Sequence, residues 1–268
     1  MRTMATREIY PNAPVVLVAV EARHPDVAPL SQGEQSELKR LLAHHFPLPQ
    51  PVQSRSFTTT IGAAPTFTEL TIPRFAARDQ TTSVTFGPQS IAVETTKHET
   101  FEHLAELVQI AVEARQRVAA VDGLLRLGLR YVDEIRVPDV SDGPTVWGDW
   151  VDPSLLGPST LGSQLGLESV NWEGATVFDR GEGRQLIVRY GPREGFAVAP
   201  GGPLHRSTPA PGPFFLLDID SFWVPSGDVP EFTATAVGEL CADLHEPVSR
   251  LFESLITKRL REEVLRNA

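Results

Sequence analysis

The apolar residues near the start of the chain follow first a strand pattern and then a helix pattern. Residues 15–22 are nearly all β-branched or small apolar residues flanked by prolines, which predicts a strand. Ser31 and Glu34 have the spacing of a capping box and predict the start of a helix. Prolines just after residue 45 would end that helix.

Several short β-prone segments come next, separated by turn signals. They predict an antiparallel meander and cover residues 56–61, 67–75, 81–86 and 90–95. Apolar residues then recur at helical spacing over residues 99–121, which predicts a long amphipathic helix. Asp122 and Gly123 are expected to end it.

The second half shows the same succession of strands and a helix, with a longer interruption. Residues 124–138 predict a strand with one mostly apolar face and one face of alternating charge. Residues 139–169 are rich in Gly, Pro, Asp and Ser, and a short helix is expected near 153–156. The remaining predicted elements are strands at 170–178 and 184–190, a long loop at 191–213, a strand at 214–223 and a helix at 233–267.

These elements predict an α+β fold, in which antiparallel sheets pack against helices. The chain divides into two unequal halves, residues 1–138 and residues 170–268, joined by a loop-rich connection at 139–169. One continuous domain is the alternative. The similar order of elements in the two halves suggests a distant duplication, which no sequence repeat supports.

The composition is that of an ordinary globular protein of 268 residues with a formal net charge of −10. This acidity argues against binding to nucleic acid or to anionic lipid. No window approaches the roughly 18 apolar residues of a membrane helix, and the N-terminus lacks the apolar core of a secretory signal. We therefore expect a cytoplasmic protein. Its single cysteine, Cys241, excludes an intramolecular disulfide.

The strand at residues 214–223 gives the clearest indication of a site. Asp218 and Asp220 lie on one face of this apolar strand, where two carboxylates need a cation, hydrogen bonds or water. They could bind a divalent cation or act in acid–base chemistry. The alternative is a structural ladder in which they pair with Arg130 or Arg136 of the other charged strand.

The charged face of the 124–138 strand also has two interpretations. Arg130 and Arg136 could bind an anionic ligand, or Arg130 and Glu134 could neutralise each other across Val132. The candidates for a ligand or ion site are thus Arg130, Glu134, Asp218 and Asp220, with the metal and any cofactor left open. The histidines lack the spacing of metal ligands, and neither a nucleophile elbow nor a phosphate-binding loop is present.

Trp147 and Trp150 lie in the loop-rich connection and have two interpretations. Aromatic side chains on a loop can anchor a protein partner, because a rigid ring contributes a large contact area. The alternative is that the two rings cap the core beneath the loop.

The C-terminal helix carries an apolar seam at alternating four- and three-residue steps, formed by Val237, Cys241, Leu244, Val248, Leu251 and Leu255. Phe252 and Ile256 widen the seam, which favours packing on the protein's own sheet. A homodimer through this helix is the alternative. Pro247 should kink the helix or begin a second one.

Three motifs resemble those of a bacterial family whose members have about 260 residues, a sporadic distribution and no assigned activity. The motifs are YPNAP at residues 10–14, LGLRYVDEI at 127–135 and FESLIT at 252–257. The resemblance would cover the whole chain. It implies a cytoplasmic bacterial protein whose scattered inheritance is typical of defence or accessory genes, and it supplies no catalytic residue.

The function favoured at this point is binding without catalysis. The protein would act as a scaffold that engages a macromolecular partner through the loop of Trp147 and Trp150 and the loop at 191–213. The resemblance extends this to an accessory role in a defence or toxin module. The alternative is a ligand- or metal-binding enzyme. Its pocket would lie between the sheet and the long helix, around Asp218 and Asp220.

Overall fold

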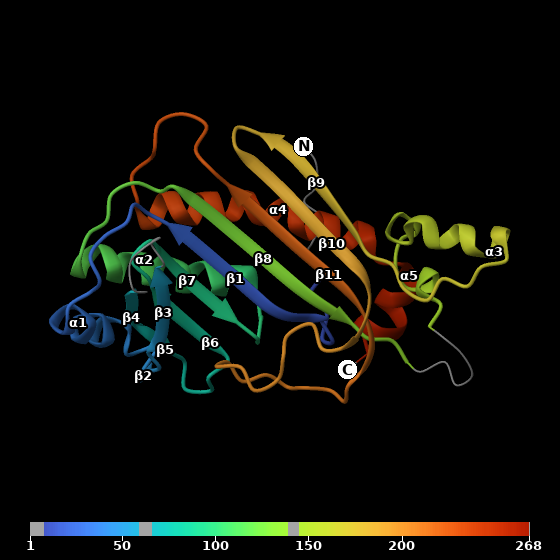
Figure 1. Ribbon diagram of the computed structural model, residues 1–268, viewed down its shortest axis with the longest axis horizontal. Coiled ribbons are helices and arrows are strands. Elements are labelled where there is room, and N and C mark those ends of the chain that lie inside the picture. Colours follow the sequence, from blue (N-terminus) through green and yellow to red (C-terminus); the bar gives the residue numbers. More distant parts are fainter. Residues whose placement is uncertain (1–7, 59–65, 139–144, 268) are drawn as a thin grey trace.

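The computed structural model describes residues 8–58, 66–138 and 145–267. Its main element is a nine-stranded antiparallel sheet with the strand order β2-β5-β6-β7-β1-β8-β11-β10-β9 (Figure 1). The strands are β1 (Val15–Arg23), β2 (Leu48–Pro49), β5 (Arg74–Ala76), β6 (Thr82–Phe86), β7 (Ser90–Thr95), β8 (Arg126–Ile135), β9 (Gly174–Gly181), β10 (Arg184–Gly195) and β11 (Gly212–Trp223). A separate two-stranded sheet pairs β3 (Val52–Thr58) with β4 (Thr66–Ile72).

The helices confirm the predicted α+β class. The three longer ones are α1 (Gln32–Leu42), α2 (Phe101–Val118) and α4 (Ala234–Leu255), and the capping box of Ser31 and Glu34 begins α1 as expected. Short turns of 3-10 helix and α3 (Gly162–Leu165) lie between β8 and β9. A last turn, α5 (Lys258–Leu260), runs into a π-helical turn, Arg261–Leu265.

The order of strands has an internal symmetry about the β1–β8 pair. In chain order, β1 precedes the meander β5-β6-β7 and α2, whereas β8 precedes the meander β9-β10-β11 and α4. In the sheet, β7 lies beside β1 and β11 lies beside β8, so each meander extends outward from the centre. This arrangement is the one that a duplicated unit would have, and the two units share one continuous sheet.

Helices α2 and α4 pack against each other and cover one face of the sheet, behind the strands in Figure 1. The main hydrophobic core lies between them and the strands, with Leu127 and Leu129 of β8 fully buried. Most of the α4 seam is part of this core: Val237, Cys241, Leu244, Val248 and Leu255 are buried within the chain. The predicted homodimer through this seam therefore lacks an exposed apolar face on α4.

Pro247 does not begin a second helix, because α4 runs through it from Ala234 to Leu255. A proline has no N–H to donate to the carbonyl four residues earlier, which belongs to Asp243. That carbonyl instead faces Arg180, whose Nη1 lies 3.4 Å away, and Arg184 donates to the Asp243 carboxylate at 2.7 Å. Arg180 of the sheet thus provides a donor for the carbonyl that Pro247 leaves without a helical hydrogen bond.

The helix predicted at 233–267 is not continuous: it breaks after Leu255 and resumes as α5 and the π-helical turn. Ile256 leaves the helix to form an antiparallel bridge with Val151, and Thr257 caps the next turn. The predicted loop at 191–213 is shorter than expected, because β10 extends to Gly195 and β11 begins at Gly212. Within the described ranges, the helices lack the combination of length and apolar character that a bilayer-crossing segment needs.

Candidate functional site

A cavity of about 510 Å³ lies between the centre of the sheet and the two long helices. Its floor is formed by β1, β8 and β11, and its walls by α4 and the start of α2. Residues 8–14, here called the N-terminal strap, complete the lining. Most of the wall is apolar, with Val15, Ile219, Val248 and Phe252 among its members. The cavity therefore has the character of a small-molecule pocket with a few polar groups.

Asp133 lies on the floor of this pocket. In the register of the sheet it pairs with Val15 of β1 on one side and with Leu217 of β11 on the other, so its direct neighbours across the strands are apolar. Its exposed fraction is 4%. Strand alternation places the Asp133 side chain on the same face as Leu129 and Tyr131, which is the face covered by helices.

Burial of the Asp133 carboxyl raises its pKa from 3.8 to about 8, and the negative charge of Asp218 on the neighbouring strand adds to the increase. Among the described residues, none forms a hydrogen bond or an ion pair with this carboxyl. Asp133 is consequently protonated at neutral pH. A protonated carboxyl at the floor of a pocket can donate a hydrogen bond or release a proton, a property typical of functional sites.

An aromatic cluster adjoins Asp133 on the pocket wall. The hydroxyl of Tyr131 lies 3.1 Å from Nδ1 of His245 on α4. Phe101 stacks on the His245 ring with 3.9 Å between the ring centroids, and His98 packs edge-on against Tyr131 at 5.4 Å. These contacts hold two imidazoles and a phenol beside the acid, all three being groups that can exchange protons.

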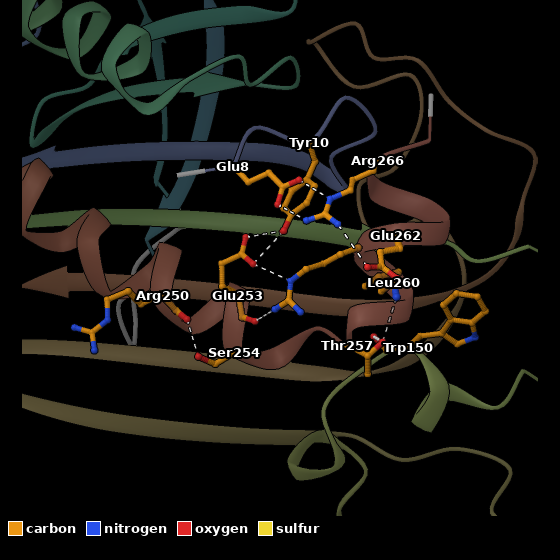
Figure 2. Close-up of polar contacts among 11 residues, drawn as sticks. Glu8, Tyr10, Trp150, Arg250, Glu253, Ser254, Thr257, Leu260, Glu262 and Arg266 are labelled. Atoms are coloured by element: carbon orange, nitrogen blue, oxygen red, sulfur yellow. Dashed lines mark hydrogen bonds and ion pairs between the residues drawn. The ribbon is translucent and has the colours of Figure 1, made fainter. Parts of the chain in front are cut away.

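The N-terminal strap is fastened to the C-terminal turns by polar contacts (Figure 2). Glu8 accepts from Nε and Nη2 of Arg266 at 2.6 and 2.8 Å, and Tyr10 donates to the Glu253 carboxylate at 3.1 Å. Asn12 adds a backbone hydrogen bond to the carbonyl of Leu265. The strap is thus held over one side of the pocket by both α4 and the last turn of the chain.

Glu253 is the centre of these contacts. Arg261 donates to its carboxylate at 3.0 Å and also to its backbone carbonyl. Burial and the Glu253 charge raise the pKa of Tyr10 to about 12, so the phenol stays protonated and continues to donate. The contact therefore persists over the whole physiological pH range.

The predicted site residues Asp218 and Arg130 pair with each other on the opposite face of the sheet. Arg130 donates to both carboxylate oxygens of Asp218, at 2.7 and 2.8 Å, and Arg189 lies 3.6 Å from the same carboxylate. This geometry is the cross-strand ladder that the sequence left as the alternative. Asp220 lies beside the ladder, and burial raises its pKa against the opposing effect of Arg126, Arg130 and Arg189.

Glu134, the fourth predicted residue, does not pair with Arg130. Its buried carboxylate accepts from Nε of Arg136 at 2.8 Å and from the backbone N–H of Ala197 at 2.8 Å, while Arg206 lies 3.5 Å away. Ala197 and Arg206 belong to the loop between β10 and β11, which covers this end of the sheet. The four predicted residues therefore lie on one face of the sheet, but the pocket opens on the other.

Trp147 and Trp150, the predicted partner anchors, are buried in their own chain, with exposed fractions of 6% and 2%. The Trp147 ring packs on Phe215 with 5.4 Å between centroids, and the Arg259 guanidinium lies 4.3 Å from the Trp150 ring centroid. Both rings cap the core, which was the alternative interpretation. Their predicted role in partner binding has no exposed ring surface to support it.

The sequence patterns did not identify four residues of the pocket: Asp133, Tyr131, His98 and His245. A signal for Asp133 was present, because strand alternation placed this acid on the face shared with Leu127, Leu129 and Ile135. The histidines gave no signal, since 147 residues separate His98 from His245 and only the fold brings both near Tyr131. Within the described residues, no group of three or more His, Cys, Asp or Glu side chains could bind a metal ion.

No protein-family model matches the chain, and no curated protein matches it. The resemblance based on the motifs at residues 10–14, 127–135 and 252–257 therefore stays a prediction. All three motifs contribute to the pocket: YPNAP is part of the N-terminal strap, LGLRYVDEI contains Tyr131 and Asp133, and FESLIT contains Phe252 and Glu253.

Proposed function

We propose that the protein binds a small organic molecule in the pocket between the sheet and helices α2 and α4. The observation that carries this proposal is the buried Asp133 carboxyl at the floor of a cavity of about 510 Å³. Burying a carboxyl in this way lowers the stability of the fold, and such a cost is typical of functional sites. The sequence predicted a pocket around Asp218 and Asp220, whereas the proposed pocket lies on the other face of the same strands.

A neutral fluorescent probe of apolar cavities, N-phenyl-1-naphthylamine, tests the proposal directly. We expect its emission to rise and shift to the blue when it is added to the wild-type protein. Ser249→Phe should abolish this signal, because Ser249 of α4 lines the cavity and the larger side chain would fill it. Ser254→Phe is the matched control, since Ser254 lies on the same helix, is exposed and does not line the cavity.

The outcome depends on the comparison of the two variants. Loss of the signal in Ser249→Phe together with its retention in Ser254→Phe would support binding in this pocket. An unchanged signal in Ser249→Phe, or no signal with the wild-type protein, would reject it. Circular dichroism of both variants establishes that they are folded.

Binding of a macromolecular partner is the second candidate, and a different surface from the tryptophan loop favours it. Strand β9 forms one edge of the main sheet, and its Val177 and Phe178 side chains are 58% and 45% exposed. An open edge with apolar side chains can add a strand from another chain. The occupant we propose is a second copy of this protein, paired antiparallel through β9.

Size-exclusion chromatography with light scattering tests this second candidate. The wild-type chain of 29.3 kDa should have twice that mass in solution, and the double variant Val177→Lys, Phe178→Lys should have the mass of one chain. A monomeric wild-type protein would reject the β9 dimer. The cytoplasmic location and the accessory role in a defence or toxin module stay predictions.

A further inference from the structure

We infer that the molecule bound in this pocket is an organic cation, with an ammonium group that pairs with Asp133 and an apolar or aromatic body. The inference rests on the proposed function and names the class of ligand.

The charged side chains that line the pocket are acidic. Besides Asp133, the described lining includes four glutamates and no Lys or Arg: Glu8, Glu99, Glu102 and Glu253. Arg266 and Arg261 pair with two of these glutamates, and Lys97 lies 3.5 Å from a third, but none of the three cations lines the cavity. A cationic ligand therefore meets carboxylates and no Lys or Arg in the described lining, although three of the four glutamates are already paired, whereas an anionic ligand meets only like charges there.

An ammonium group at the floor would remove what keeps Asp133 protonated. The carboxylate form is disfavoured by burial and by the charge of Asp218, and a cation in direct contact offsets both. The step is balanced: the ligand arrives as an ammonium ion, Asp133 releases its proton to solvent, and a carboxylate–ammonium pair remains. Such a charge-assisted pair is stronger in a buried site than in water.

The aromatic side chains of the lining suit the rest of such a ligand. Tyr10, Tyr131 and Phe252 line the cavity, and Phe101 supports the ring of His245 from behind. Aromatic faces attract both organic cations and flat apolar bodies. The wall therefore complements a ligand that carries its charge at one end.

The expected pH dependence involves more groups than Asp133 alone. Those that share the pocket with it come from every element around it: Tyr131 on β8, His245 and Glu253 on α4, His98 and Glu99 just before α2, Glu102 in its first turn, and Glu8 and Tyr10 on the strap. Asp218 acts on it from the opposite face of β11. The titration of Asp133 is distinguished from theirs by substituting Asp133 itself.

Three probes of equal size and different charge test the inference: tryptamine, a cation, tryptophol, its neutral analogue, and indole-3-acetate, an anion. Calorimetric titrations at neutral pH are made in phosphate and in Tris, whose ionisation enthalpies differ, so that the proton count per binding event is measured. We expect tryptamine to bind at least about tenfold more tightly than tryptophol, and indole-3-acetate to bind most weakly. Close to one proton should be released for each tryptamine bound.

Asp133→Asn should remove both the preference for tryptamine and the proton release, because an asparagine has no proton to lose at this pH. It keeps the shape of the protonated acid, so the fold should be retained. Asp220→Asn is the matched control: the same change on the same sheet, on the face away from the pocket, should leave both readouts unchanged.

Equal affinity for tryptamine and tryptophol, a preference for indole-3-acetate, or tryptamine binding without proton release would overturn the inference. So would failure of all three probes. The neutral naphthylamine probe, which carries no charge, separates these results from failure of the proposed function. If that probe binds and Ser249→Phe abolishes its signal, the pocket stands and only the cation preference is lost.

Discussion

Asp133 and Glu134 are consecutive residues of β8 with nearly the same burial, 4% and 5% exposed, but their surroundings are opposite. Glu134 faces the loop between β10 and β11 and is held by two arginines and a backbone amide. Asp133 faces the pocket, where no described residue pairs with its carboxyl, and it keeps its proton. The comparison teaches that burial of an acid does not identify a site, whereas the way in which its charge is balanced does.

The largest expected effect is on the paired acid. Glu134→Gln should lower the free energy of unfolding by about 3–5 kcal/mol, because it leaves the buried Arg206 side chain and Arg136 without their counter-charge. Urea denaturation measures the change. Binding of the naphthylamine probe should persist in the folded variant, since Glu134 lies on the face away from the pocket. Loss of binding in a well-folded Glu134→Gln protein would contradict the separation of the two faces.

Substitution of Asp133 should change the free energy of unfolding in the opposite direction. Asp133→Asn should raise the free energy of unfolding at neutral pH by about 2–4 kcal/mol, because an amide needs no proton to remain neutral in the core. A decrease in stability would show that the carboxyl makes a favourable contact in the folded state. Thermal and urea denaturation of both proteins, in the same buffer, provide the test.

The stability difference between the wild-type protein and Asp133→Asn should depend on pH. Unfolded Asp133 loses its proton near its ordinary pKa of 3.8, but the folded protein keeps the proton up to about pH 8. Between these values the unfolded state binds fewer protons, so the wild-type stability should fall as pH rises and then level off above about 8. The advantage of Asp133→Asn should therefore be small near pH 4 and largest above pH 8.

Asp218 lies on the same face as Glu134, but its charge also acts on Asp133. Asp218→Asn should cost about 1–2 kcal/mol, a modest value because the Arg130 side chain that it pairs with is 51% exposed. The charge of Asp218 also contributes to the raised pKa of Asp133, so the variant should lower that pKa. NMR titration of the Asp133 carboxyl carbon measures the shift, and an unchanged pKa would contradict the coupling.

The smallest effect concerns the N-terminal strap. Tyr10→Phe removes the hydrogen bond to Glu253 and should lower the free energy of unfolding by about 1 kcal/mol, with the ring still packed in place. If the strap also closes the pocket, the naphthylamine probe should dissociate faster from this variant in stopped-flow measurements. An unchanged dissociation rate would show that the strap serves stability alone.

Local patterns in the sequence predicted much of the fold. The capping box of Ser31 and Glu34 begins α1, and the predicted strand at 90–95 coincides with β7, because such elements are encoded by neighbouring residues. The C-terminal helix was predicted as one unbroken helix. Its break at Ile256 is produced by a bridge to Val151, a contact between distant residues that no local pattern contains.

The candidate site was less accessible to prediction. Strand alternation correctly placed Asp218 and Arg130 on one face, and the structure joins them as a ladder. Asp133 was visible as an acid on an apolar face, but its significance depends on how α4 and the strap enclose it. Those elements lie more than a hundred residues away in the sequence, so only the three-dimensional structure shows the pocket.

The symmetry of the sheet gives the pocket a particular position. Among the described strands, β1 and β8 form the single pairing that joins the first unit to the second, and the cavity lies over this seam. Its lining takes Val15 and His98 from one unit, and Asp133 and Phe252 from the other. A molecule in the cavity would contact both units and stabilise their pairing. Its dissociation and the opening of the β1–β8 pairing would therefore be thermodynamically linked.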